Sequence, residues 1–212
     1  MNKYVLLAGA AVVAFATSAS AFEMTPYAAL RGSWDFTRNN MVASGTYSSE
    51  KIKFNDGVWG LHAALGAKHG AFRLETEYNT NKTAHKKVTI DSTVKLNMRT
   101  ESILVNAYWD INTCSRFTPY VSAGAGLAKL NFRAKTEDYV SKANPSNFAW
   151  QVGAGVSYAA TDSIDVDLGY RYVDTGAAYI MKQYAGGRQG GSMKEKINTA
   201  RHELYAGLRY NF

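Results

Sequence analysis

Four histidines and one cysteine are the side chains best suited to catalysis or metal binding. An acyl hydrolase or transferase needs a His next to a Ser and a carboxylate, because the imidazole activates the hydroxyl. The histidines, at His62, His69, His85 and His202, fall in four separate segments, and no two have the spacing of metal ligands. Cys114 lies in a predicted turn. The sequence therefore predicts no catalytic residue, no metal site and no cofactor.

Two pairs of carboxylates are the other candidates for chemistry. Both have the spacing that places two side chains on one face of a strand, at Glu75 and Glu77 and at Asp165 and Asp167. Arg73 and Arg171 lie on the same faces, two to four residues away. An arginine at that distance favours an ion pair, so we expect these carboxylates to be structural rather than catalytic.

Segments of about ten residues in which apolar and polar residues alternate recur along the chain, and this period of two indicates strands. We predict eight strands, at residues 26–36, 57–68, 71–80, 98–111, 118–132, 147–159, 163–174 and 199–212. The connections alternate strictly in length. The short ones are 69–70, 112–117 and 160–162, and the long polar ones are 37–56, 81–97, 133–146 and 175–198.

Alternating tight turns and long loops are typical of an up-and-down barrel in an outer membrane, with periplasmic turns and extracellular loops. We therefore predict an all-β protein, an eight-stranded antiparallel transmembrane up-and-down barrel. The even number of strands places both ends of the barrel domain on the periplasmic side.

The two faces of the predicted strands favour a membrane barrel over a soluble one. One face carries aliphatic and aromatic residues, such as Trp59, Leu61 and Leu65, and would contact lipid. The other face carries charges, ten of which we expect to form an ion-pair network in the lumen: Arg31, Arg73, Glu75, Glu77, Asp165, Asp167, Arg171, Arg201, Glu203 and Arg209. Buried charges are tolerated when paired, and a barrel of eight strands is narrow enough for side chains to fill. We therefore expect a plugged lumen.

The first residues have the features of a secretory signal peptide. Lys3 is followed by an apolar run to about Ala16 and by the small residues Ala19, Ser20 and Ala21. That run is too short to cross a bilayer as a helix. We predict a signal peptide at 1–21, cleaved after Ala21, and a barrel domain at 22–212, exported to the outer membrane of a Gram-negative bacterium.

Four segments of the predicted strands carry the motifs of a known family. They are "NAYWDINTCSRFTPYVSAGAGLAKL" (106–130), "FRLETEYN" (72–79), "VDLGYRYVDT" (166–175) and "LYAGLRYNF" (204–212). The first resembles a strand, turn and strand of the opacity-protein and surface-antigen family of outer-membrane barrels, the second resembles the third strand of that family, and the other two resemble its last two strands. The resemblance covers the predicted barrel apart from the four long loops. It implies a surface barrel, porin-like in architecture, and leaves its activity open, because members are adhesins, structural barrels or small porins.

The last strand resembles the C-terminal strands that the outer-membrane assembly machinery recognises. Leu208, Tyr210 and Phe212 share its apolar face. The resemblance implies that these three residues are the assembly signal.

The long loops carry 14 cations and six anions, whereas the predicted lumen is balanced. Ten of the cations make up a predicted loop basic patch: Lys51, Lys53, Lys82, Lys86, Lys87, Lys135, Lys182, Arg188, Lys194 and Lys196. A surface of one sign attracts acidic partners, here lipopolysaccharide phosphates, sulfated glycans or acidic host proteins rather than nucleic acid. The sequence leaves open whether the patch holds lipopolysaccharide headgroups or binds a dedicated ligand.

These observations predict a non-enzymatic surface barrel, structural and adhesin-like, embedded in outer-membrane lipid and lipopolysaccharide. Two alternatives remain. A small porin-like channel would pass water or small solutes beside the lumen arginines, and a lipid A-modifying enzyme would depend on His85 or His202.

Overall fold

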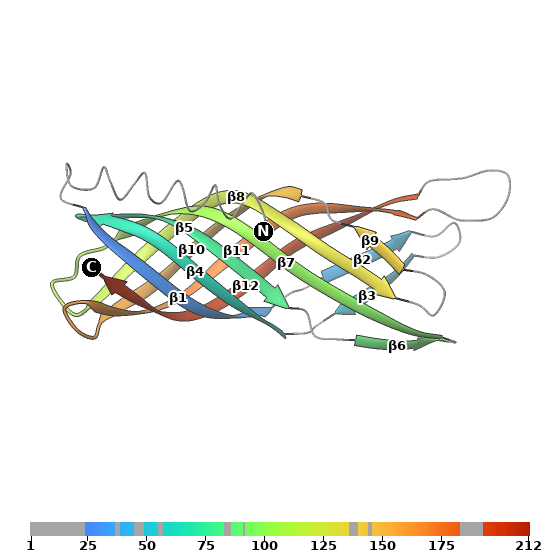
Figure 1. The fold of residues 1–212 in the computed structure, drawn as a ribbon, viewed down its shortest axis with the longest axis horizontal. Helices are drawn as coiled ribbons and strands as arrows, with labels where there is room; N and C mark the ends of the chain where they lie inside the picture. Colours follow the sequence, from blue (N-terminus) through green and yellow to red (C-terminus); the bar gives the residue numbers. More distant parts are fainter. Residues whose placement is uncertain are drawn as a thin grey trace.

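A computed structural model of the chain describes residues 24–36, 39–44, 49–54, 57–82, 86–90, 92–135, 140–143, 146–182 and 193–212. Eight long strands form one closed antiparallel barrel, inclined to its long axis (Figure 1). They are β1 (Thr25–Phe36), β4 (Gly57–His69), β5 (Phe72–Lys82), β7 (Ser92–Asp110), β8 (Phe117–Lys135), β10 (Ser146–Ala159), β11 (Ile164–Lys182) and β12 (Met193–Asn211). The predicted fold is confirmed.

Each of these strands pairs with the long strand before it and the long strand after it, and β12 closes the barrel against β1. In that closing pair Leu30 lies opposite Leu208, and Trp34 lies opposite Leu204. Because a strand that slips by one residue would turn its charged face outward, this register keeps the arginines inside.

Parts of the expected loops are strands, which corrects the sequence prediction there. Four short strands lie in these segments: β2 (Asn39–Ser44), β3 (Ser49–Phe54), β6 (Lys86–Ile90) and β9 (Val140–Ala143). β2 pairs with β3, β6 with β7, and β9 with β8. β11 and β12 continue as a ribbon as far as Lys182 and Met193, with a bulge between Asp174 and Ala177. The sequence prediction missed these strands because their segments are polar and rich in Lys, Ser, Thr, Asn and Gly, a composition that favours loops.

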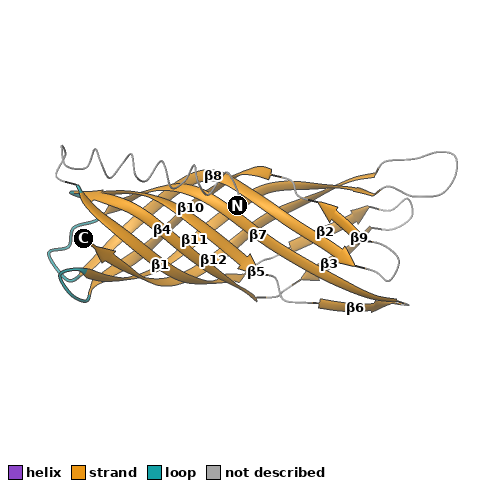
Figure 2. Ribbon diagram, in the orientation of Figure 1, coloured by secondary structure: helices purple, strands orange, loops and turns teal. Residues whose placement is uncertain are grey.

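The short turns lie at one end of the barrel, called here the turn end, together with the C terminus (Figure 2). They comprise residues 70–71, 111–116 and 160–163, and the opposite end is called the loop end. Cys114 lies exposed in the second turn, with its backbone at a φ of 53°. The predicted signal peptide lies outside the described residues.

The outer face of the barrel is apolar. Leu30, Leu127 and Leu208 keep 56–58% of their surface exposed, and Trp34 packs edge to face on Trp59 with 4.5 Å between ring centroids. An exposed apolar surface of this extent marks a surface that another apolar phase covers. In the described part of the chain, no helix has the length and apolar character needed to cross a membrane.

Candidate functional site: a lumen of ion pairs

The lumen holds the charged side chains that the sequence assigns to it. Nine of the ten predicted network residues keep 7% or less of their surface exposed, and Asp165, near the turn end, keeps 17% of its side chain exposed. They come from β1, β5, β11 and β12, because each of these strands turns every second residue inward. Charge therefore fills the space where a soluble barrel has its apolar core.

Glu75 is the most heavily bonded carboxylate at the turn end. The Arg31 guanidinium donates to both of its oxygens, at 2.8 and 2.9 Å, which is the two-point geometry of a strong ion pair. The Tyr108 hydroxyl donates at 2.7 Å and the Tyr27 hydroxyl at 3.0 Å. Asn106 adds a longer bond of 3.3 Å. One carboxylate thus fastens β5 to β1 and β7 through the lumen.

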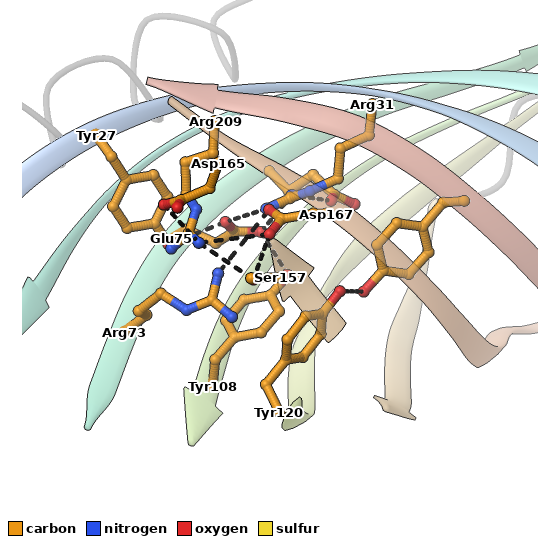
Figure 3. A network of polar contacts seen from close by, with 12 residues as sticks. Tyr27, Arg31, Arg73, Glu75, Tyr108, Tyr120, Ser157, Asp165, Asp167 and Arg209 are labelled. Carbon is orange, nitrogen blue, oxygen red and sulfur yellow. Dashed lines mark hydrogen bonds and ion pairs between the residues drawn. The ribbon is translucent and has the colours of Figure 1, made fainter. Parts of the chain in front are cut away.

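Asp167 lies beside this carboxylate, among arginines from three strands (Figure 3). Its oxygens lie 3.4 Å from the Arg209 guanidinium, 3.7 Å from Arg31 and 4.0 Å from Arg73, and Ser157 donates to it at 2.5 Å. Glu75, Asp167 and the groups around them form the turn-end cluster, whose other members are Tyr27, Arg31, Arg73, Tyr108, Asp110, Ser157, Asp165 and Arg209.

Arg171 joins four strands near the middle of the lumen. Its guanidinium lies 2.8 Å from Glu77 of β5, 2.5 Å from Glu203 of β12 and 2.8 Å from the His62 Nδ1 of β4. Arg201 adds a second contact to Glu203, at 2.6 Å. Because Arg171 itself comes from β11, this one cation crosses the width of the barrel.

Apart from Arg201 with Glu203 on β12, the described lumen pairs run between strands rather than along them, which differs from the sequence expectation. Arg73 contacts Asp110 of β7, at 2.8 Å, instead of the glutamates two and four residues further along β5. Arg171 likewise contacts Glu77 and Glu203 rather than the aspartates of its own strand. The tilt and stagger of the strands decide which side chains meet in a barrel.

Sequence reasoning missed two carboxylates in the lumen. Asp35 lies 3.5 Å from Arg201, and Asp110 contacts both Arg73 and Lys68. The expected balance of five arginines and five carboxylates is therefore incomplete. The alternation of β1 places Asp35 on the same inward face as Arg31, so it could have been predicted. It was missed because it lies at the end of the strand.

Four tyrosines in the lumen were also missed as a group. The Arg73 guanidinium lies between the rings of Tyr108 and Tyr120, at 4.5 and 4.8 Å from their centroids, and the hydroxyls of Tyr120 and Tyr205 lie 2.9 Å apart. Tyr27 completes the set through its bond to Glu75. Glycine makes this packing feasible, because a Cβ at Gly169 would collide with the Tyr205 ring.

Towards the loop end, three neighbouring side chains have spare hydrogen-bonding atoms. His62, Asn79 and Ser102 lie side by side on β4, β5 and β7, and all three are buried. Neither polar atom of the Asn79 side chain has a partner among the described residues, and the same is true of the Ser102 hydroxyl and the His62 Nε2. These three residues are called the loop-side row.

The candidates for catalysis or metal binding do not come together. His62 lies in the lumen, His69 is exposed at the end of β4, and His202 lies on the outer face, where its Nδ1 is 2.6 Å from the Tyr170 hydroxyl. His85 lies outside the described residues. Within the described ranges, no group of three His, Cys, Asp or Glu side chains could hold a metal ion.

The other two predicted sites are described only in part. Leu208, Tyr210 and Phe212 lie on the outer face, and the Phe212 amide donates to Pro26 of β1 at 3.0 Å. Of the loop basic patch, Arg188 lies outside the described residues, and the structure describes no side chain for the other nine: Lys51, Lys53, Lys82, Lys86, Lys87, Lys135, Lys182, Lys194 and Lys196.

Comparison with known proteins gives a family and several relatives. The family model described as outer membrane protein beta-barrel domain matches residues 5–212. Outer membrane protein PagN of Salmonella typhimurium is 33% identical over 125 residues, which are 56% of this chain and 52% of that protein. The chain thus spans about half the length of this relative.

Solved structures share the fold. Neisserial surface protein A superposes with a TM-score of 0.58 at 21% identity, over 89% of this chain and 97% of that one. Ail, the attachment invasion locus protein of Yersinia pestis, in complex with the heparin analogue sucrose octasulfate, gives a TM-score of 0.52 at 12% identity, over 89% and 98%.

Proposed function

The chain belongs to the outer membrane protein β-barrel family, and from that premise we propose that it is a non-enzymatic surface barrel with a closed lumen and ligand-binding basic loops. The cross-lumen contacts of Arg171 with Glu77, Glu203 and His62 carry the proposal. A solute could pass only by separating these buried charges, and parting a buried ion pair leaves charge without compensation.

The ion pairs give the barrel its rigidity in this proposal. Glu75 and Arg171 tie together strands that are not neighbours in the sheet, such as β5 with β11. Such contacts across the lumen keep the barrel from flattening. The backbone hydrogen bonds between neighbouring strands do not prevent flattening. A rigid support is the setting in which loops most often carry binding functions.

The loops would bind acidic ligands at the cell surface. Their excess of cations supports this part of the proposal, because a surface of one sign attracts partners of the other. The heparin analogue bound to Ail gives a sulfated glycan as a reasonable first probe. Lipopolysaccharide phosphates carry the same kind of charge and are the second probe.

Binding of the refolded chain to immobilised heparin at increasing salt tests the loop assignment. Replacing Lys51, Lys53, Lys86 and Lys87 by Gln should weaken binding and flatten its dependence on salt, because fewer ion contacts form. The control is Arg116→Gln, which removes a cation at the turn end. Equal binding by the loop variant and the unmodified chain would refute the assignment, and competition by lipopolysaccharide identifies the preferred ligand.

The assignment as a non-enzyme has its own test. His85→Ala and His202→Ala should leave the lipid A of cells producing the barrel unchanged relative to cells with the unmodified chain. A modification of lipid A that appears with the unmodified chain and is lost in either variant would make the protein a lipid A-modifying enzyme.

A further inference from the structure

A furrow runs over the outer face of the barrel from the turn end. One hollow, of about 640 Å³, lies over β8, β10 and β11 and is lined by Arg116, Phe117 and Tyr158, among others. A second hollow, of about 550 Å³, lies over β1, β10, β11 and β12, and Trp59 of β4 also lines it. Val156 and Leu168 line both hollows, so the two are continuous.

Small outward residues form the floor of the furrow. Gly32 lies opposite Ala206 in the β1–β12 pair, and Ala154 lies opposite Tyr170 in the β10–β11 pair. A Cβ placed on Gly32 would meet nothing within 4 Å. Larger outward side chains, including Leu168 and Tyr170, stand beside these positions. The furrow is therefore a depression in the apolar outer face and belongs to a different surface from the charged lumen.

A cation stands at the turn end of this furrow. Arg116 is exposed, has no ion pair with any described residue, and is the only Lys or Arg in the three short turns. Two other cations whose side chains reach the barrel surface differ in this respect, since Arg99 lies 3.0 Å from Glu101 and Lys68 lies 3.3 Å from Asp110. An apolar furrow that ends at an unpaired guanidinium matches an anionic amphiphile.

We propose that the furrow binds one phospholipid of the periplasmic leaflet, with its phosphate at Arg116 and an acyl chain over Val156 and Leu168. Short turns face the periplasm in outer-membrane barrels, so the turn end meets the leaflet that is built of phospholipid. Guanidinium binds phosphate through two parallel hydrogen bonds, which fixes the headgroup. The acyl chain of the lipid would cover the apolar surface of the furrow. The convex outer face of a second barrel would not fill this depression.

Native mass spectrometry of the full refolded chain, loaded with phosphatidylglycerol and then stripped with detergent, tests this site. One phospholipid should remain bound per barrel. Arg116→Gln should raise the apparent Kd about tenfold, because a charge-assisted contact to phosphate is lost. The charge-matched control is Arg99→Gln, on the same outer face towards the loop end, which should retain lipid like the unmodified chain.

A second variant tests the furrow itself. Ala206→Phe fills the floor and should also release the lipid, whereas Ala123→Phe, outward on β8 and outside the furrow, should not. Equal retention by Ala206→Phe and Ala123→Phe, or equal loss in the two arginine variants, would mean general lipid adhesion and overturn the proposal. A dimer that forms without lipid and is abolished by Ala206→Phe would give the furrow to a second barrel instead.

Discussion

The turn-end cluster and the loop-side row lie in the same lumen, but they differ in how completely their polar groups are bonded. In the turn-end cluster every carboxylate has an arginine partner, and the spare atoms belong to groups that are bonded elsewhere, such as the Arg73 guanidinium on Asp110. In the loop-side row the whole side chains of Asn79 and Ser102 lack partners among the described residues.

This difference indicates two kinds of interior. Unbonded polar groups that are buried are costly, and ordered water usually satisfies them when no side chain does. The row offers both donors and acceptors, which suits water better than an ion. We therefore expect a dry ion-pair plug at the turn end and a hydrated compartment beyond Arg171, with Leu104, Ala128 and Ala149 as its apolar wall.

Removing the cation between the two regions should have the largest effect. Arg171→Leu leaves Glu77 and Glu203 buried without their main partner, and loss of one member of a buried pair costs about 3–5 kcal/mol. Urea unfolding, followed by the heat-dependent shift of the folded barrel on gels, measures the change. Arg99→Leu on the outer face is the control and should change stability by about 0.5 kcal/mol or less. Equal losses would contradict a structural role for the lumen pairs.

Removing one hydroxyl from the turn-end cluster should have an intermediate effect. Tyr108→Phe keeps the ring against Arg73 but removes the 2.7 Å bond to Glu75. A hydrogen bond to a charged group contributes about 1.5–3 kcal/mol, so the free energy of unfolding should fall by that amount. Tyr158→Phe, on the outer face, should be nearly neutral. If Tyr108→Phe left the free energy of unfolding unchanged, the turn-end cluster would tolerate unpaired polar groups as the loop-side row does.

Removing the amide of the loop-side row should have the smallest effect. Asn79→Leu exchanges water contacts for apolar ones, so we expect a change of about 1 kcal/mol or less. Asn106→Leu is the matched variant at the turn-end cluster. It should cost more, because Asn106 donates to Glu75 at 3.3 Å and accepts from Gln151 at 3.2 Å.

Hydration of the row can be measured directly by NMR. Magnetisation transfer from water to the Asn79 side-chain amide should be strong, and transfer to the Asn106 amide should be weak. Equal transfer at both amides would remove the distinction between the two regions.

Much of the barrel follows from alternation in the sequence. The strand predicted at 57–68 is β4 at Gly57–His69, and the one predicted at 147–159 is β10 at Ser146–Ala159. The charged residues fall inside because the same alternation decides which face points to lipid. The outer ends of β11 and β12 were missed because the polar, glycine-rich composition of residues 175–198 favoured a loop.

The partners within the lumen could not be predicted in the same way. Arg73 meets Asp110, 37 residues away, because Arg73 lies opposite Tyr108 in the β5–β7 pair and Asp110 is the next inward residue of β7. A long loop joins these two strands, so their register does not follow from a turn. The alternation of β7 turns Tyr108 inward, but its contacts with Arg73 and Glu75 depend on the register between β5 and β7. Similar numbers of arginines and carboxylates on the lumen face predict that ion pairs form there. They do not predict which residues pair.

The closed lumen is tested most directly by single-channel conductance of the refolded chain in a planar bilayer, with folding verified by the gel shift on heating. The cross-lumen contacts of Arg171 and the turn-end cluster predict a folded barrel with no conductance. Steady ohmic steps, lowered or changed in selectivity when Arg31, Arg73 or Arg171 is neutralised, would contradict the plugged lumen and make the protein a small pore.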